Sequence, residues 1–186
     1  MIHLRIFLPV FFLLYFLLIF LMYPNPKKEK PQKLKRITVL NDLIWMLVIA
    51  LVTFFSLFPD VYHEYIFPIE VLKSHVLSWT AIGIMSIAFF LVFLTKNEHR
   101  LHKNQTRNGW LLLDSGVYAK SRNPLYIGQI ITLVGLFLCI PSIYSAILLL
   151  IGSMIVSIRV VLEEKVLESV FGDDYLEYEN RVRRWL

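Results

Sequence analysis

Three charged residues that follow an apolar run could bind a charged ligand. Arg159, Glu163 and Glu164 come directly after the uncharged stretch 143–158. A spacing of four places Arg159 and Glu163 on one face of a helix. Two adjacent carboxylates at a membrane exit are costly unless they meet a cation, and a ligand with an ammonium or sulfonium group would supply one. A surface ion pair of small energetic value is the alternative interpretation.

A second polar stretch, residues 114–128, contains Arg122, Asn123 and Pro124 in succession. Gly116 suits a turn in this stretch. Pro124 fixes its own φ and keeps Asn123 out of the helical conformation, so we expect a helix to begin here. The free backbone N–H groups at such a start can bind a carboxylate. An ordinary helix start with Tyr and Arg side chains at the membrane surface is the alternative.

A third segment, residues 171–178, contains one glycine, two aspartates and two tyrosines. Gly172 can end one helix, and an aspartate can cap the next. Apolar residues on either side recur at helical spacing, which is typical of an amphipathic helix at a membrane interface.

The elements that must position these segments are predicted by the apolar runs. Of the 186 residues, 57% are apolar and 18% are charged, which excludes a soluble globule and a disordered chain. A membrane helix needs about 20 residues, so the composition suffices for about five spans. We place these spans at residues 6–22, 39–58, 76–94, 125–140 and 143–158.

The last two runs have 16 residues each and predict a tight helical hairpin that turns at Pro141-Ser142. The polar stretches on either side of this hairpin are expected to meet at its base. Gly128 and Gly135 are seven apart, so they share a face and allow a neighbouring helix to approach closely. Gly152 allows the same on the return arm. The remainder of the chain, from residue 159 on, is interpreted as a charged amphipathic tail.

Lysine and arginine cluster beside the apolar runs, and this pattern predicts orientation. Segments 24–38 and 96–124 carry six Lys or Arg each and the tail carries five, whereas the interfacial loop 59–75 carries one. Because cytoplasmic loops are enriched in these residues, we expect the N-terminus outside and the basic segments in the cytoplasm. Clusters of this kind indicate anionic lipid headgroups rather than nucleic acid. The expected location is a bacterial-type cell membrane or the endoplasmic reticulum.

Ionisable residues lie at the edges of the apolar runs rather than in their middle, which disfavours an ion pump or a proton relay. His99 and His102 could share a helix face, but two ligands make a weak metal site. We interpret both as solvated loop histidines and predict no metal site.

Two motifs flank the hairpin in a fixed order. The first reads Gly116-x-Tyr118-x-x-x-Arg122-Asn123-Pro124-x-Tyr126-x-Gly128. The second reads Arg159-x-x-x-Glu163-Glu164-x-x-Leu167-x-x-x-Phe171-Gly172-x-x-Tyr175-x-x-Tyr178-x-x-x-Val182-x-Arg184. Together they resemble the motifs of the isoprenylcysteine carboxyl methyltransferase family and its phospholipid-methyltransferase-like relatives. The resemblance covers about residues 109–186.

The resemblance implies an integral membrane methyltransferase that uses S-adenosylmethionine on a lipophilic substrate. The expected methyl acceptor is the carboxylate of a prenylated cysteine or a similar lipid-linked acid. Arg159 and Glu163 would be catalytic: Arg159 would orient the substrate carboxylate, and Glu163 would hold the cofactor's amino group. The implied cofactor-binding residues are Leu112, Leu113, Tyr118, Arg122, Asn123, Pro124, Leu125, Tyr126, Glu163 and Glu164.

Asn123 departs from the family pattern, which commonly has histidine at this position. Asparagine keeps a hydrogen-bond donor and an acceptor but does not titrate. A mechanism that needs a base here is therefore in doubt. Methylation of a carboxylate needs none, because that group is already ionised at neutral pH.

The expected fold is all-α: a polytopic membrane protein of about five spans, with a short hairpin of helices 4 and 5 and a C-terminal amphipathic cytoplasmic helix. Residues 1–186 are expected to form a single membrane domain, in which 1–95 supply three scaffold spans. Residues 96–186 would supply the cofactor-binding loop, the hairpin and the C-terminal helices.

Three alternative functions stay open. The first is a phospholipid N-methyltransferase, and the second is a non-catalytic membrane or lipid-binding relative. The third is a sterol-reductase-like enzyme that uses NADPH, although the sequence has no glycine-rich dinucleotide fingerprint.

Overall fold

The regular structure of the described chain is helical. The computed structural model describes residues 2–21, 31–58, 69, 74–102, 106–107 and 109–186. Within them the elements are α1 (Ile2–Leu21), α2 (Gln32–Leu57), α4 (His75–Leu101), the short 3-10 helix η2 (Gly116–Ala119), α5 (Pro124–Cys139), α6 (Ile143–Phe171) and α7 (Asp173–Arg181). The all-α prediction is confirmed for these residues. Nearly all of the predicted loop 59–75, and Lys27, Lys28, Lys30 and Lys103, lie outside the described ranges.

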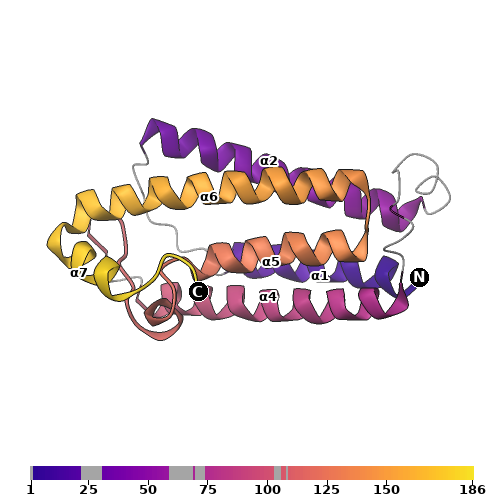
Figure 1. The fold of residues 1–186 in the computed structure, drawn as a ribbon, viewed down its shortest axis with the longest axis horizontal. Coiled ribbons are helices and arrows are strands. Elements are labelled where there is room, and N and C mark those ends of the chain that lie inside the picture. Colours follow the sequence, from indigo (N-terminus) through magenta and orange to yellow (C-terminus); the bar gives the residue numbers. More distant parts are fainter. Residues whose placement is uncertain (1, 22–30, 59–68, 70–73, 103–105, 108) are drawn as a thin grey trace.

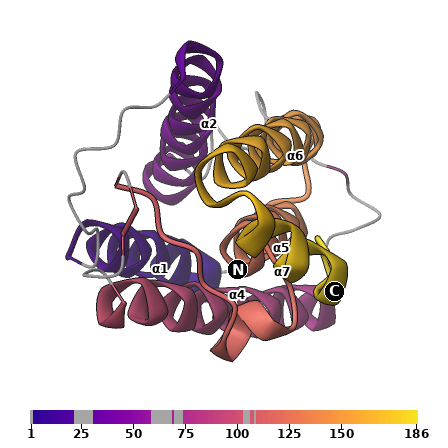
Figure 2. The same ribbon diagram turned by 90° about the vertical axis from the view of Figure 1, so that its left-hand side faces the viewer.

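Three of these helices, α2, α4 and α6, are long and apolar enough to cross a membrane. Two further apolar stretches, His3–Leu18 within α1 and the whole of α5, are shorter. The helices lie side by side in one bundle, with α5 between α4 and α6 (Figures 1 and 2). The starts of α2 and α5 and the ends of α1, α4 and α6 gather at one end of this bundle (Figure 1).

The helical hairpin is confirmed, and its turn lies at the predicted place. Ser142 caps α6, because its Oγ accepts a hydrogen bond from the Ser145 N–H at 3.2 Å. In return, the Ser142 N–H donates to Ser145 Oγ at 3.1 Å, which completes a capping box. The first arm, α5, begins at Pro124 as expected.

The return arm is longer than the sequence predicted. The prediction that this arm ends at residue 158 was wrong. The helix α6 has 29 residues and ends at Phe171. The charged residues after 158 include good helix formers, and no proline or glycine interrupts them before Gly172, where φ is 57°. At 1.5 Å per residue, α6 is about 43 Å long and exceeds a hydrocarbon core of about 30 Å. Its last turns, with Arg159 and Glu163, therefore extend the membrane helix instead of starting a separate tail.

Glycines bring the hairpin close to its neighbours, as predicted. A Cβ on Gly128 would lie 2.7 Å from Val92 Cγ2 of α4, and a Cβ on Gly135 would overlap Met85 of the same helix. On the return arm, a Cβ on Gly152 would lie 2.8 Å from Leu133 Cδ1. These contacts fix how α5 packs between α4 and α6.

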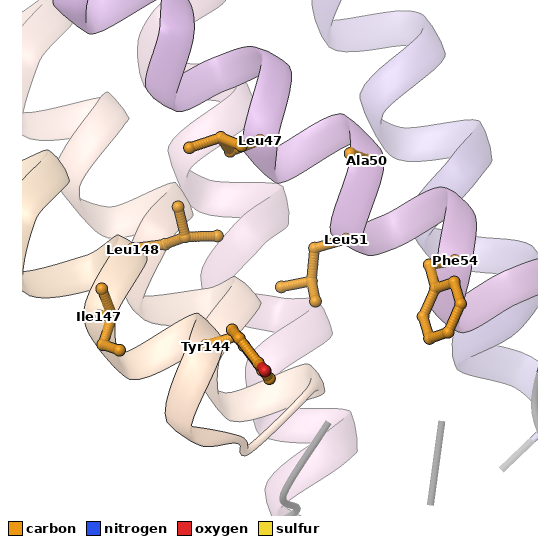
Figure 3. Close-up of a pocket in the computed structure, with 7 residues that line it drawn as sticks. All are labelled: Leu47, Ala50, Leu51, Phe54, Tyr144, Ile147 and Leu148. Carbon is orange, nitrogen blue, oxygen red and sulfur yellow. The ribbon is translucent and has the colours of Figure 1, made fainter. Parts of the chain in front are cut away.

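An apolar cavity of about 460 Å³, open toward the outside of the bundle, lies between α2 and α6, toward the hairpin turn. Figure 3 shows side chains from both helices pointing into it. The lining residues are Leu47, Ala50, Leu51, Phe54, Tyr144, Ile147 and Leu148. Its lining is almost wholly hydrocarbon, so it is suited to an apolar chain rather than to a polar ligand.

Candidate active site

The two polar stretches that flank the hairpin meet at its base. Asn123 Nδ2 donates a hydrogen bond to Glu164 Oε1 at 2.7 Å, so the residue before α5 contacts the far part of α6. Asn123 is outside the helical conformation, with φ −130° and ψ 47°, and Pro124 is the first residue of α5. This agrees with the restraint that a proline imposes on its predecessor.

A partly enclosed cavity of about 90 Å³ opens beside the start of α5. Its lining residues are His99, Trp110, Leu111, Leu112, Leu113, Tyr118, Arg122, Asn123, Leu125, Tyr126, Glu163, Leu167 and Tyr178. Eight of the ten residues implied for the cofactor are in this lining, and the two outside it are Pro124 and Glu164. Residues from four separate segments of the chain thus converge on one cavity.

Arg159 and Glu163 form a pair at the edge of this cavity. Arg159 Nε donates to Glu163 Oε1 at 3.2 Å, and the two side chains are 15% and 23% exposed. The Arg159 guanidinium also lies over the Tyr126 ring, 5.4 Å from its centroid, in a cation–π arrangement. Arg159 is not itself in the lining, but it contacts two residues that are. The site therefore carries both charges next to an aromatic wall.

The turn at η2 places Tyr118 against the end of α4. Gly116 has φ 56°, and a Cβ there would overlap the Glu98 carboxylate, so this position needs glycine. The Tyr118 hydroxyl lies 3.2 Å from His99 Nδ1, and the Tyr118 carbonyl accepts from the Tyr178 hydroxyl at 2.8 Å. Burial raises the pKa of both tyrosines well above the ordinary value, so both stay protonated at neutral pH.

Five lining residues were not among those implied for the cofactor: His99, Trp110, Leu111, Leu167 and Tyr178. The interpretation of His99 as a solvated loop residue was wrong, because α4 continues to Leu101 and turns His99 toward Tyr118. The absence of proline and glycine from 94 to 101 was a usable signal for this extension. Leu167 and Tyr178 belong to the second motif, but the motif did not assign them to the cofactor; Tyr178 is buried in α7.

Glu164 lies outside the cavity lining and is almost fully engaged by neighbours. Besides the bond from Asn123, its Oε2 accepts from Arg184 Nε at 2.8 Å. Arg122 Nε lies 3.7 Å from Glu164 Oε1, and Arg122 also donates to Glu179. Burial acts to lower the pKa of Arg122, but the bond to Glu179 and the charge of Glu164 outweigh it and raise that pKa. The contact of Glu164 with a cofactor stays a prediction.

Side chains that bind metal ions do not gather into a cluster in the described part of the chain. No group of three or more His, Cys, Asp or Glu side chains there could hold a metal ion. The candidate site contains carboxylate, guanidinium, amide, imidazole and aromatic groups.

The three membrane-length helices place the chain among integral membrane proteins. The profile of the phospholipid methyltransferase family matches residues 75–174, more than half of the sequence. The chain therefore belongs to this family, and the resemblance drawn from its motifs is confirmed. The matched region contains α4, η2, α5 and α6 and every lining residue of the cavity except Tyr178.

A related protein is the Protein-S-isoprenylcysteine O-methyltransferase of Schizosaccharomyces pombe. It is 27% identical over 126 residues, which cover 67% of this chain and 52% of the relative. The chain thus spans about half the length of this relative.

Proposed function

We propose that the chain is an S-adenosylmethionine-dependent methyltransferase that acts on a lipophilic substrate. One observation carries this proposal: Asn123, Tyr118, Tyr126 and Glu163 line one cavity at the base of the hairpin. That cavity lies in the region matched by the methyltransferase family. The proposal also takes residues 1–186 as a single membrane domain.

The donor set of the cavity fits the cationic end of this cofactor. Glu163 offers a carboxylate that is 23% exposed, and Tyr126 offers an aromatic face beside it. Carboxylate and aromatic groups both attract ammonium and sulfonium cations. When bound, S-adenosylmethionine supplies an electrophilic methyl group. Glu163 would hold its amino group, and the backbone around Leu112 and Leu113 would line its site.

The cavity at the base of the hairpin is too small to hold the whole cofactor as it stands. Its volume of about 90 Å³ is below the roughly 300–1,000 Å³ of typical ligand sites. Only one end of a cofactor fits in it without movement of the lining. We propose that binding widens the cavity by displacing side chains along 110–113 or in α7.

Arg159 is the proposed partner of an acidic methyl acceptor. A guanidinium can hold a carboxylate through two parallel hydrogen bonds, which fixes its orientation. The acceptor carboxylate is ionised at neutral pH, so the site has to align it and exclude water rather than remove a proton. Tyr126 and Leu125 supply the dry wall for this alignment. We propose the carboxylate of a prenylated cysteine, or a similar lipid-linked acid, as this acceptor.

The lipid tail of such a substrate has a candidate path along α6. Leu148 of the apolar cavity lies eleven residues before Arg159 on the same helix, which is about 16 Å. An extended isoprenoid or acyl tail can span this distance. We propose that the tail lies along α6 and ends between α2 and α6, where the cavity of about 460 Å³ is found.

The proposed topology has five spans, with α1 and α5 crossing beside the three long helices. The N-terminus would lie outside and the site in the cytoplasm, in a bacterial-type cell membrane or in the endoplasmic reticulum. Lys33, Lys35, Arg100 and Arg122 support this orientation, because they belong to the segments gathered at one end of the bundle. Labelling of single introduced cysteines from each side of the membrane would test it.

An amine acceptor, as in phospholipid N-methylation, is the second candidate. His99 favours it, because this side chain lines the cavity and an imidazole can accept a proton near neutral pH. A protonated amine must lose a proton before it attacks a methyl group, so this reaction needs such a base.

Methyl transfer in detergent tests both candidates. Purified protein is given S-adenosylmethionine with a radiolabelled methyl group and either farnesylated cysteine, phosphatidylethanolamine or a small hydrophobic acid. We expect the label in a base-labile ester of the farnesylated acid, and none with Glu163→Gln. Label in phosphatidylethanolamine would instead establish the amine reaction. Cofactor binding without transfer would favour a non-catalytic relative, and binding of NADPH alone would favour a reductase.

A further inference from the structure

Glu164 is a buried carboxylate with partners on both of its oxygens. It is 5% exposed, and the side chain lies at the base of the hairpin. Oε1 accepts from Asn123 Nδ2 at 2.7 Å, and Oε2 accepts from Arg184 Nε at 2.8 Å. A buried carboxylate is tolerated when such bonds satisfy it. Glu164 thus joins the start of α5 to a segment that follows α7.

Residues 182–186, here named the C-terminal strap, cross the start of α5. The Arg183 carbonyl accepts a hydrogen bond from the backbone N–H of Arg122 at 2.9 Å, and the Arg184 carbonyl accepts one from the Ser121 hydroxyl at 3.2 Å. Trp185 packs against the cluster of Tyr126, Val156 and Val160. The strap therefore contacts the start of α5 and packs against Tyr126, which lines the cavity.

The contacts of Asn123 fix which atom of its amide can face the cavity. Nδ2 lies 2.7 Å from Glu164 Oε1 and 3.3 Å from the Arg184 carbonyl, and both of these oxygens only accept hydrogen bonds. The NH₂ group must therefore point toward them, because a flipped amide would set oxygen against oxygen. Since Asn123 also lines the cavity, its Oδ1 is the atom left to accept a hydrogen bond from a ligand.

We propose that Glu164 is a positioning residue that holds the Asn123 amide, through Asn123 Nδ2 and the C-terminal strap, with Oδ1 toward an N–H or ammonium donor of the cofactor. This inference rests on the proposed function. It assigns Glu164 a role different from that of Glu163, although the two are adjacent: Glu163 contacts the ligand, and Glu164 acts through Asn123. The geometry gives each carboxylate its own side of α6.

An exchange of amide and carboxylate tests this role. Asn123→Asp sets two carboxylates against each other, and Glu164→Gln leaves Arg122 and Arg184 without their shared anion. We expect each single variant to weaken S-adenosylmethionine binding about ten- to hundredfold. In the double variant, the new amide on α6 donates to the new carboxylate before α5, and the net charge of the cluster is restored. Its binding should recover to within about tenfold of the wild type, because the exchange restores the bond to residue 164 but not the weaker one to the Arg184 carbonyl. Glu168→Gln, an exposed carboxylate one turn further along α6, is the matched control and should bind normally.

Arg184→Gln provides a second measurement, should the buried variants fold poorly. Its side chain is 42% exposed, so its loss is tolerable for folding. We expect the KM for the cofactor to rise about tenfold while kcat changes little. A variant that merely loosens the fold would lower kcat and the thermal midpoint together.

The outcomes separate this inference from the proposed function. If the wild type binds no S-adenosylmethionine, the proposed function is wrong and the positioning role is wrong with it. If the wild type binds but the double variant is as weak as the product of the two single effects, only the positioning role is overturned. A direct cofactor contact by Glu164 would give that second result.

Discussion

Arg159 Nε donates a hydrogen bond to Glu163 Oε1 at 3.2 Å, one helical turn apart on α6. This places a cation and an anion beside Tyr126, on the wall that α5 contributes to the cavity. Opposite charges suit opposite ligands, because a carboxylate attracts a cationic cofactor and a guanidinium attracts an anionic acceptor. We therefore expect the two residues to have different roles during turnover: Glu163 binds the cofactor, and Arg159 binds the methyl acceptor.

Alanine at either position should reveal these two roles. We expect Arg159→Ala to lower kcat about 10²–10³-fold with cofactor affinity nearly unchanged. Glu163→Ala should instead weaken cofactor binding about ten- to hundredfold. Titration of the purified variants with labelled S-adenosylmethionine, beside the transfer assay, measures both. Equal loss of binding in the two variants would contradict the assignment.

The bond from Tyr178 to the Tyr118 carbonyl should contribute measurably to stability. Tyr178→Phe removes the hydroxyl and leaves a buried carbonyl without that donor, which costs about 1–3 kcal/mol. The thermal midpoint in detergent should fall. Tyr118→Phe is the control, because it keeps the carbonyl bond and loses only the contact with His99. An equal or larger fall for Tyr118→Phe would show that the side-chain contact matters more.

Close packing of α5 on α4 predicts that a single methyl group at Gly128 is destabilising. A Cβ there would lie 2.7 Å from Val92, whose β-branched side chain has little freedom to move. We expect Gly128→Ala to cost about 1–3 kcal/mol. Gly83→Ala in α4 is the control, since a Cβ there meets nothing within 4 Å and alanine favours helix by up to about 1 kcal/mol. Stability at the wild-type level in both variants would refute the packing argument.

Filling the apolar cavity should alter the preference for tail length. Ala50 lines this cavity in α2, and tryptophan there would occupy much of it. We expect Ala50→Trp to lower kcat/KM for a farnesylated acid about tenfold, because a buried tail loses apolar contact, while a short-chain acid is unaffected. The ratio of the two kcat/KM values is the measurement. A parallel loss for both acids would place the tail elsewhere.

Local rules were sufficient to predict the hairpin and its contact faces. Pro124 determines where α5 begins, and Pro141-Ser142 determine where the hairpin turns. The spacing of Gly128 and Gly135 predicted which face of α5 a neighbouring helix approaches, and the structure shows that this neighbour is α4. The meeting of the two polar stretches followed from the hairpin itself. Each of these features depends on residues close in sequence or on a single steric requirement.

The features that the sequence did not predict depend on contacts between distant segments. Hydropathy marks where a helix leaves the hydrocarbon core but not where it ends, so the extensions of α4 and α6 were missed. His99 joined the cavity through one of these extensions. The bond between Arg184 and Glu164 requires the reversal of direction at Gly172, and side-chain spacing does not specify the angle of that reversal.

The unbroken course of α6 couples the bilayer to the cavity. From its cap at Ser142 to its end before Gly172, this helix is one stiff rod, with Leu148 among the apolar side chains and Glu163 at the polar cavity. A helix of this length adapts to a thinner or thicker bilayer by changing its tilt. Because Glu163 lies on this helix and Asn123 precedes α5, we expect a change in the tilt of α6 to alter the distance between these two lining residues.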